Sequence, residues 1–190
     1  MALINFNLIA STFKYGEEDA QEELLDILEL FGDYRPESQI TDIKGVVVAY
    51  TNLDLFRVVD SLRQVVKNEP WKIRYVLRLI PIEYVVHTKL EDMVNAAKNL
   101  TPKMHSQDTF RITVERRHTF MSTADIIATL ASQIDNKVDL KDPDWIVLIE
   151  IIGALTGVSV LKPDQIFRLL IEKRNSTISN SYFDNKNATL

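Results

Sequence analysis

Two hydrophobic periods alternate along the first half of the chain. A period of two predicts strands, and apolar residues three or four positions apart predict amphipathic helices. The predicted elements are a strand over 3–11, a helix over 17–31, strands over 38–43 and 45–50, a helix over 55–66 capped by Asn52, and a strand over 71–83. This strand–helix–strand–strand–helix–strand order is that of a ferredoxin-like domain, which we expect over residues 1–84.

The second half continues with a different series of elements. We predict a helix over 89–100, a strand over 110–115, a helix that begins at the capping box of Ser122, a buried strand over 145–152, a returning strand over 158–161 and a helix over 163–173. These elements form a second domain over residues 85–174, and the fold class is α+β. Residues 175–190 are rich in Asn, Ser and Thr, and we expect them to form a disordered tail.

Charge is unevenly distributed along this acidic chain, whose net charge is −5. Residues 1–95 carry 10 basic and 16 acidic side chains, whereas residues 96–190 carry 12 basic and 11 acidic ones. The segment 98–118 alone has five basic residues against two acidic ones. Because salt screens exposed charges beyond about 8–10 Å, a local basic surface matters more to RNA than the sum does.

Composition removes several classes of chemistry. The chain has no cysteine, so thiol nucleophiles and Cys-ligated metals are excluded, and its five glycines form no phosphate-binding loop. Three aspartates, Asp139, Asp142 and Asp144, are better explained as a turn beside Pro143 than as a calcium loop. We therefore expect no catalytic residues, no metal and no cofactor. The apolar runs are too short to span a membrane, and we expect a cytoplasmic protein.

Several spaced segments of the second half resemble the motifs of a THUMP domain. They are FRITVERR at 110–117, the helix that begins at Ser122, KVDLKDPD at 137–144, VLIEII at 147–152 and VSVL at 158–161. The last three together resemble stand-alone THUMP proteins of archaea and eukaryotes that assist tRNA acetylation. RLIPI at 78–82 is similar to a segment just upstream of the domain in those proteins.

The resemblance implies a ferredoxin-like domain followed by an α/β THUMP domain, and it implies binding of structured RNA, mostly tRNA near its acceptor end. Some relatives carry a fused catalytic module, but no methyltransferase glycine motif, pyrophosphatase loop or acyl-CoA-binding loop occurs before Leu190. We therefore expect a non-catalytic adaptor, not an enzyme, that presents tRNA to a separate acetyltransferase for N4-acetylcytidine formation. Its expected partners are tRNA and that acetyltransferase, with no membrane and no DNA.

Cationic side chains near the THUMP motifs are the candidate RNA contacts, because guanidinium groups bind phosphate bidentately and stay charged. The candidates are Lys103, Arg111, Arg116, Arg117, His118, Lys137, Arg74 and Arg78. Arg74 and Arg78 are an even number of positions apart, so we expect them on one face of the strand over 71–83. These cations could instead form solvated strand ends that pair with nearby acids such as Glu115 or Asp108.

A second hypothesis gives the main role to the acidic helix over 17–31. Its acidic residues include Glu22, Glu23 and Asp26, and no basic residue lies between positions 17 and 29. The protein would then be a protein-interaction scaffold. A further alternative is a tRNA-binding subunit of a different RNA-modifying complex.

Overall fold

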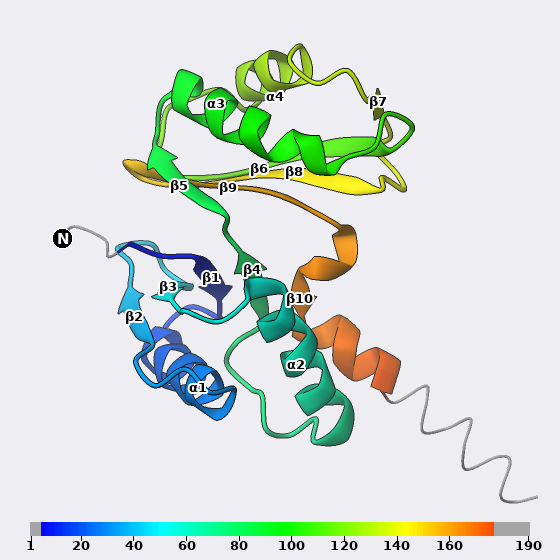
Figure 1. The fold of residues 1–190 in the computed structure, drawn as a ribbon. Coiled ribbons are helices and arrows are strands. Elements are labelled where there is room, and N and C mark those ends of the chain that lie inside the picture. The colour runs from blue at the N-terminus through cyan, green and yellow to red at the C-terminus, as the bar shows by residue number, and fades with distance from the viewer. Residues whose placement is uncertain (1–4, 177–190) are drawn as a thin grey trace, which may run out of the picture. The chain divides into compact units, whose positions relative to one another are not determined.

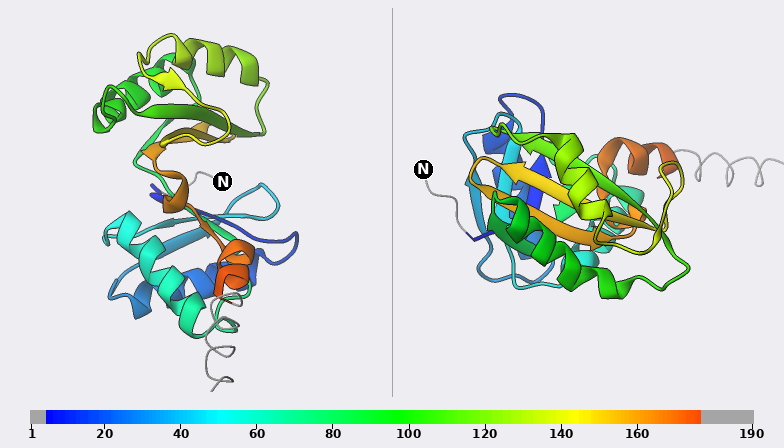
Figure 2. Two further views of the ribbon diagram at one scale, coloured as in Figure 1. Left: turned by 90° about the vertical axis from the view of Figure 1, so that its right-hand side faces the viewer. Right: turned by 90° about the horizontal axis from the view of Figure 1, so that it is seen from above.

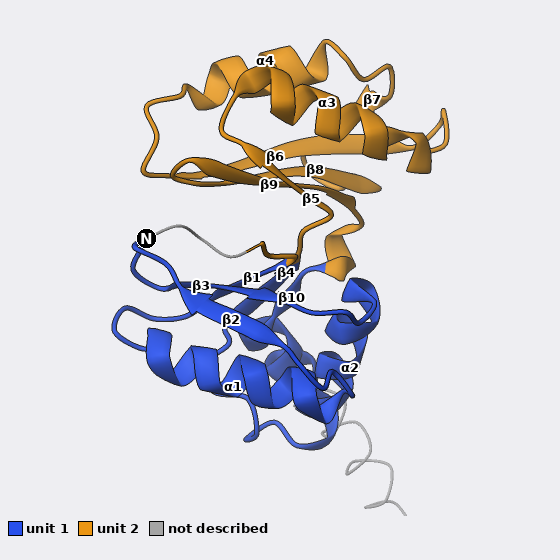
Figure 3. Cartoon of the chain, turned by 60° about the vertical axis from the view of Figure 1, so that its left-hand side comes forward, with its two compact units in different colours: residues 1–4, 8–80, 166–190 blue, residues 5–7, 81–165 orange. Residues whose placement is uncertain are grey.

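The computed structural model describes residues 5–176, which fold into two compact units (Figure 3). Among these residues, unit 1 contains 8–80 and 166–176, and unit 2 contains 5–7 and 81–165. The chain thus leaves unit 1 after Ile80 and returns to it at Ile166. Among the described helices, none has the length and apolar character that crossing a membrane requires.

Unit 1 is a five-stranded sheet covered on one face by two long helices (Figure 1). Its elements are β1 (Leu8–Ser11), α1 (Glu17–Leu30), β2 (Glu37–Ile40), β3 (Val46–Tyr50), α2 (Leu55–Asn68), β4 (Arg78–Pro81) and β10 (Phe167–Arg168). The strand order is β10-β4-β1-β3-β2, and β1 runs antiparallel to β3. Leu8 from β1, Leu24 from α1 and Leu62 from α2 are fully buried in its core, so both helices use their apolar stripe against the sheet.

The start of α2 shows how local chemistry sets an element boundary. The Asp54 carboxylate accepts the backbone N–H groups of Phe56 at 3.0 Å and Arg57 at 2.9 Å, which satisfies two otherwise unpaired donors of the first turn. Asn52 is therefore not the cap that the sequence led us to expect. Its own backbone N–H donates to Asp33 at 3.1 Å.

A loop replaces the first half of the strand expected over 71–83. The Glu23 carboxylate on α1 accepts the backbone N–H groups of Arg74 at 2.7 Å, Tyr75 at 2.9 Å and Val76 at 2.7 Å. Because these donors bind a side chain, they are not available to a neighbouring strand. The expected strand over 71–77 is wrong, and Trp71, at the start of this segment, is 62% exposed.

The segment after residue 162 also differs from the single helix expected over 163–173. It consists of a 3-10 turn (Pro163–Gln165), strand β10 and a helical stretch over 169–176. β10 pairs antiparallel with β4, and the Leu169 N–H donates to the Leu77 carbonyl at 2.9 Å. From Ile166 onward this segment belongs to unit 1, although we expected it in the second domain. Of the expected tail, residues 175 and 176 are helical, and 177–190 lie outside the described residues.

Unit 2 is a second five-stranded sheet with two helices on one face, as Figures 1 and 2 both show. Its elements are β5 (Tyr84–His87), α3 (Leu90–Leu100), a 3-10 turn (Thr101–Lys103), β6 (Thr109–Arg117), α4 (Thr123–Ala131), β7 (Lys137–Val138), β8 (Trp145–Ile152) and β9 (Leu155–Leu161). The strand order is β5-β9-β8-β6-β7, in which β6 runs parallel to β7 and β8. β5 and β7 are thus the edge strands.

The core of unit 2 lies between this sheet and helices α3 and α4. Met93 of α3, Ile126 of α4 and Phe110 of β6 are among its buried residues. The Ser122 hydroxyl accepts the Asp125 N–H at 3.3 Å, so the expected cap of this helix is present. Gly153 joins β8 to β9 with a φ of 59°, a left-handed conformation that suits glycine in a tight turn.

Candidate nucleic-acid interface

The predicted arginines of β6 alternate between the two faces of its sheet. Phe110, Ile112 and Val114 pack in the core beneath α3 and α4. Because side chains alternate along a strand, Arg116 shares that helix-covered face, whereas Arg111 and Arg117 lie on the opposite face. The three arginines therefore do not form one cationic row.

Two of the predicted cations form ion pairs within unit 2. Arg117 donates to the Glu150 carboxylate at 2.7 Å, and Glu150 is completely buried. Lys103 pairs with Glu83 and also donates to the Val160 carbonyl at 3.4 Å. A buried carboxylate needs a cationic or hydrogen-bonding partner, so a structural role explains Arg117 without any RNA.

Two other arginines bind backbone carbonyls and form no ion pair within residues 5–176. Arg111 donates to the Leu140 carbonyl at 3.1 Å, in the loop after β7. Arg116 donates to the Met121 carbonyl at 2.7 Å and so holds the loop that connects β6 to α4. Both loops carry motif residues of the sequence, and the arginines fix their paths.

The remaining candidates lie apart from one another. Lys137 pairs with Thr109 at the amino end of β6, while His118 follows its carboxyl end. The nine residues of β6 span about 25 Å at roughly 3.3 Å per residue. Arg78 is in β4 and Arg74 in the preceding loop of unit 1, so the expectation that they share a strand face is wrong.

A hollow of about 480 Å³ lies at the carboxyl end of β6. Its walls come from the loop after β6, the turn between β8 and β9, and the loop between β5 and α3. We call the side chains of His87, Lys89, His118 and Phe120 around it the β6-end surface. The ring of Phe120 is fully exposed to solvent.

The β6-end surface combines two kinds of chemistry that RNA-binding sites use. Within the described part of the chain, the side chains of His87, Lys89 and His118 have no hydrogen-bond or ion-pair partner. They are therefore available to phosphate oxygens, while an exposed aromatic ring offers a face on which a base can stack. His118 also has a φ of 56°, a left-handed conformation that non-glycine residues seldom adopt and that clusters at functional positions.

Sequence reasoning found His118 but missed the other three members. His87 ends β5, Lys89 lies in the loop after it, and Phe120 lies in a loop about 30 positions later in the chain. Only the fold of the sheet brings these segments together. The one local signal is Phe120, an aromatic residue between Thr119 and the Ser122 cap. Its position precedes the helix and is not part of that helix's apolar stripe.

The KVDL motif holds a turn together at the opposite end of the sheet. The Asp139 carboxylate accepts the backbone N–H groups of Lys141 at 2.9 Å and Asp142 at 3.1 Å. These bonds, from Asp142 first, lower the pKa of Asp139 because they stabilise its charged form. Among the described residues, no group of three or more His, Asp or Glu side chains is placed to hold a metal ion.

Asp108 plays a similar part beside that turn. It accepts the His105 backbone N–H at 2.8 Å and the indole N–H of Trp145 at 2.9 Å, and both bonds lower its pKa. Asp144 accepts the N–H and hydroxyl of Thr109 at 2.8 and 2.9 Å. The acidic motif residues of this end thus serve as hydrogen-bond acceptors for the protein's own loops.

Residues 87–161 match the family model described as "THUMP domain". In agreement, the chain is 36% identical over 118 residues to THUMP domain-containing protein 1 of Homo sapiens, covering 56% of this chain and 33% of that protein. Residues 87–161 form a THUMP domain. This THUMP domain runs from the end of β5 to the end of β9 and contains the β6-end surface. The chain spans about a third of the length of the curated relatives it matches.

Solved structures resemble the chain well beyond the THUMP domain. The crystal structure of PH1313 from Pyrococcus horikoshii has a TM-score of 0.64 at 16% identity, covering 83% of this chain and 55% of that one. A 4-thiouridine synthetase, crystallised as an RNA complex with bound ATP, has a TM-score of 0.51 at 15% identity, covering 83% and 42%. At these identities the likeness establishes a shared mixed α+β fold.

Proposed function

We propose that this protein is a non-catalytic tRNA-binding protein that presents tRNA to a separate acetyltransferase for N4-acetylcytidine formation. The proposal combines the THUMP domain with the motif resemblance of residues 137–161 to stand-alone adaptors of that type. A structural relative that was crystallised as an RNA complex supports RNA as the ligand. We further propose that unit 1 is a ferredoxin-like domain, because its element and strand orders fit that fold, and that the protein works in the cytoplasm.

The observation that carries the proposal is the β6-end surface. It places an ammonium group, two imidazoles and an exposed phenyl ring around one hollow, in a molecule whose net charge is −5. Lys89 and the histidines would contact phosphates and 2′-hydroxyls of a folded RNA, while Phe120 stacks on a base that leaves the helix. Such contacts recognise the shape of a folded RNA and hold it in position. They do not require the protein to modify a base of the bound RNA.

The residue inventory supports the proposal that the protein has no catalytic chemistry of its own. The sequence has no cysteine and no glycine-rich phosphate loop, and its polar motif residues are engaged in holding loops. A protein of this kind acts by fixing the orientation of its RNA, which raises the effective concentration of the target base at a partner enzyme.

Binding is tested by titrating tRNA with the full chain at several salt concentrations. We expect an affinity near micromolar or better at low salt, with a log–log slope of about −0.7 to −0.9 per phosphate contact. Absence of tRNA binding under these conditions would overturn the function. A DNA hairpin of the same length is the matched competitor, and it should compete poorly.

The adaptor role is tested by reconstitution. The RNA acetyltransferase of the same organism should acetylate tRNA with acetyl-CoA and ATP only when this protein is added, as measured by mass spectrometry of nucleosides. Product formed by this chain and acetyl-CoA alone would show that it is an enzyme. If the acetyltransferase is equally active with and without this protein, the adaptor role is overturned, whereas the tRNA-binding function is not.

A scaffold role through α1 is the second candidate, since Glu18, Glu22 and Asp26 are exposed and have no partner within the described residues. Glu23 is different, because its carboxylate holds the loop over 74–76. Charge reversal at Glu18, Glu22 and Asp26, with Glu23 left intact, should abolish a complex with a basic partner if this role is real. tRNA affinity should then stay within about twofold, since surface charges far from a site are screened.

A further inference from the structure

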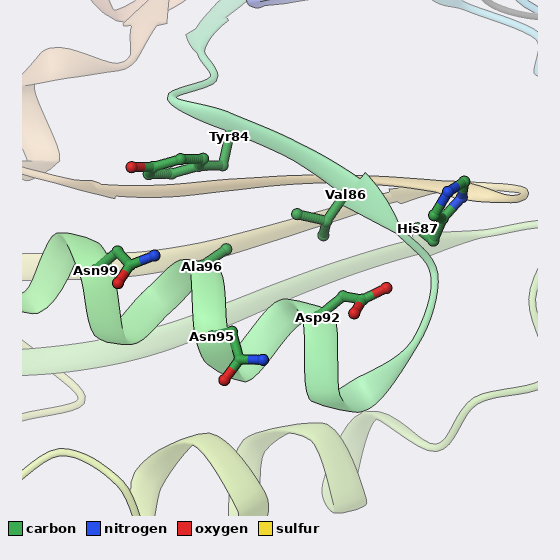
Figure 4. Close-up of a pocket in the computed structure, with 7 residues that line it drawn as sticks. All are labelled: Tyr84, Val86, His87, Asp92, Asn95, Ala96 and Asn99. Atoms are coloured by element: carbon green, nitrogen blue, oxygen red, sulfur yellow. The ribbon is translucent and has the colours of Figure 1, made fainter.

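A second hollow, which we call the α3 groove, lies between strand β5 and helix α3 of unit 2 (Figure 4). It has a volume of about 290 Å³. Tyr84 and Val86 of β5 form one wall, and Asp92, Asn95 and Asn99 of α3 form the other. Ala96 lies between them on the helix.

The spacing of the helix residues explains why this wall is polar and hollow. Asp92, Asn95 and Asn99 are three and four positions apart, so they follow one face of α3. The adjacent face carries Met93 and Leu100 into the core. Ala96 is 4% exposed and ends at Cβ, which leaves room that a longer side chain would fill.

The polar groups of the α3 groove are available to a ligand. Within the described residues, neither the two amides nor the Asp92 carboxylate makes a side-chain hydrogen bond. Together they provide N–H donors, carbonyl acceptors and an acceptor-only carboxylate within one hollow.

The opposite wall provides an aromatic surface. Tyr84 is 43% exposed on edge strand β5, and Figure 4 shows its ring across the groove from Asn99. His87 ends the same strand and lines both the α3 groove and the hollow of the β6-end surface. The two hollows are therefore adjacent along one surface of unit 2.

We propose that the α3 groove binds one unpaired RNA base that carries an exocyclic amino group, and so discriminates against uracil. The proposal rests on the tRNA-binding function and names residues that read sequence at its site. A nucleobase is flat and smaller than the ligands that fill pockets of about 300–1,000 Å³, so the size fits. Continuity through His87 favours the same RNA strand as occupant over an unrelated ligand.

The preference follows from the donor and acceptor pattern. Side-chain amides pair with base edges that present one donor and one acceptor, and a carboxylate accepts a hydrogen bond from an exocyclic amino group. Adenine and cytosine offer this amino donor beside a ring nitrogen acceptor. Uracil presents a carbonyl oxygen where cytosine has its amino group, and the Asp92 carboxylate would repel that oxygen. The N3–H and O4 of uracil still suit a side-chain amide, so Asp92 sets the preference and the two amides add affinity. Tyr84 adds stacking, which every base accepts.

The test compares oligonucleotides of one base type on the full chain. Labelled hexamers of A, C and U are titrated in fluorescence anisotropy, alongside intact tRNA. We expect the A and C hexamers to bind about tenfold more tightly than the U hexamer, the size of discrimination that one good side-chain–base pair provides. The double variant Asn95→Ala/Asn99→Ala should weaken the binding of all three hexamers, while Gln107→Ala, another exposed amide of unit 2, should leave it unchanged.

Asp92→Ala separates base reading from general attraction. Removing this carboxylate removes its repulsion of the RNA phosphates and of the uracil carbonyls. The U hexamer should therefore bind as well or better, while the preference for A and C falls. Tyr84→Ala should weaken all three hexamers by a similar factor, and Tyr84→Phe, which keeps the ring, should not.

The outcomes distinguish this proposal from the function on which it rests. If the protein does not bind tRNA, the proposed function fails. If it binds tRNA but shows no preference among the hexamers, or if Asp92→Ala keeps the preference, the α3 groove does not read a base and only this proposal is overturned. Circular dichroism of each variant verifies that the fold is intact.

Discussion

The two ends of the sheet in unit 2 use their polar residues in opposite ways. At the amino end of β6, Asp108, Asp139 and Asp144 bind the protein's own N–H and hydroxyl groups, and Arg111 binds a loop carbonyl. At the carboxyl end, Lys89 and its neighbours in the β6-end surface face a hollow and bind no described residue. The end of the sheet that carries the KVDL motif is therefore not the end whose side chains are available to a ligand.

The largest expected effect concerns Arg117, a predicted RNA contact at the carboxyl end that pairs with a buried carboxylate. Arg117→Met removes the guanidinium that donates to the buried Glu150 carboxylate, and we expect a loss of about 3–5 kcal/mol in the free energy of unfolding. Urea denaturation followed by circular dichroism measures it. Arg117→Met/Glu150→Leu should recover at least half of the loss, because no charge then remains buried. A stable Arg117→Met protein with weakened tRNA binding would instead place Arg117 on the RNA.

Charge reversal at the two ends of β6 gives the next largest effect. Lys89→Glu should weaken tRNA binding about tenfold. It should also reduce the log–log slope of affinity against salt by the equivalent of about 1–2 phosphate contacts. Lys137→Glu, at the amino end and exposed to a similar degree, should change affinity less than about twofold. Equal losses for both variants would mean that RNA extends over the whole strand and that the two ends do not differ.

Removal of an exposed aromatic ring is expected to have a somewhat smaller effect. Phe120→Ala should weaken tRNA binding about fivefold, near the lower end of the stacking contribution per base. Phe120→Trp, which keeps an aromatic face, should retain the affinity. Because Phe120 is fully exposed, thermal stability should not fall in either variant. A normal affinity for Phe120→Ala would show that this ring does not touch RNA.

The smallest effect is the pH dependence of the amino end. Asp108 and Asp139 have pKa values below the ordinary 3.8, owing to hydrogen bonds from backbone N–H groups, and in Asp108 also from an indole. The unfolded chain therefore takes up these protons first. Their stabilisation is complete above about pH 4–5 and is lost as the pH falls through the lower folded values. Urea denaturation at several acidic pH values should give a shallower acid slope for Asp108→Asn/Asp139→Asn, and an unchanged slope would contradict these assignments.

Local patterns predicted those parts of the fold that depend on neighbouring residues. The Ser122 cap, the apolar strand β8 and the amphipathic helix α1 all follow from spacing within about ten positions. The loop over 71–77 did not, because its cause is Glu23, about 50 positions earlier in the chain. Hydrophobic periodicity along the sequence does not report a distant carboxylate that binds backbone N–H groups.

The candidate site shows the same limit. Clustering of positive residues along the sequence pointed to Lys103 and Arg117, yet each pairs with a glutamate that lies 20 or more positions away. His87 and Phe120 gave no charge signal and became neighbours only when β5 and β6 joined one sheet. The motifs identified a THUMP domain, but several of their polar residues hold loops in this protein, so the motifs do not locate a ligand.

The path of the chain through unit 1 has a consequence for synthesis on the ribosome. Strand β10 completes the sheet at the β4 edge, and the chain reaches it only after all of residues 81–165. During translation the THUMP segment leaves the exit tunnel while the first sheet still has an open edge. The nascent polypeptide adds β10 to that edge last. A chain truncated before Ile166 therefore contains a THUMP domain attached to a unit 1 that lacks β10.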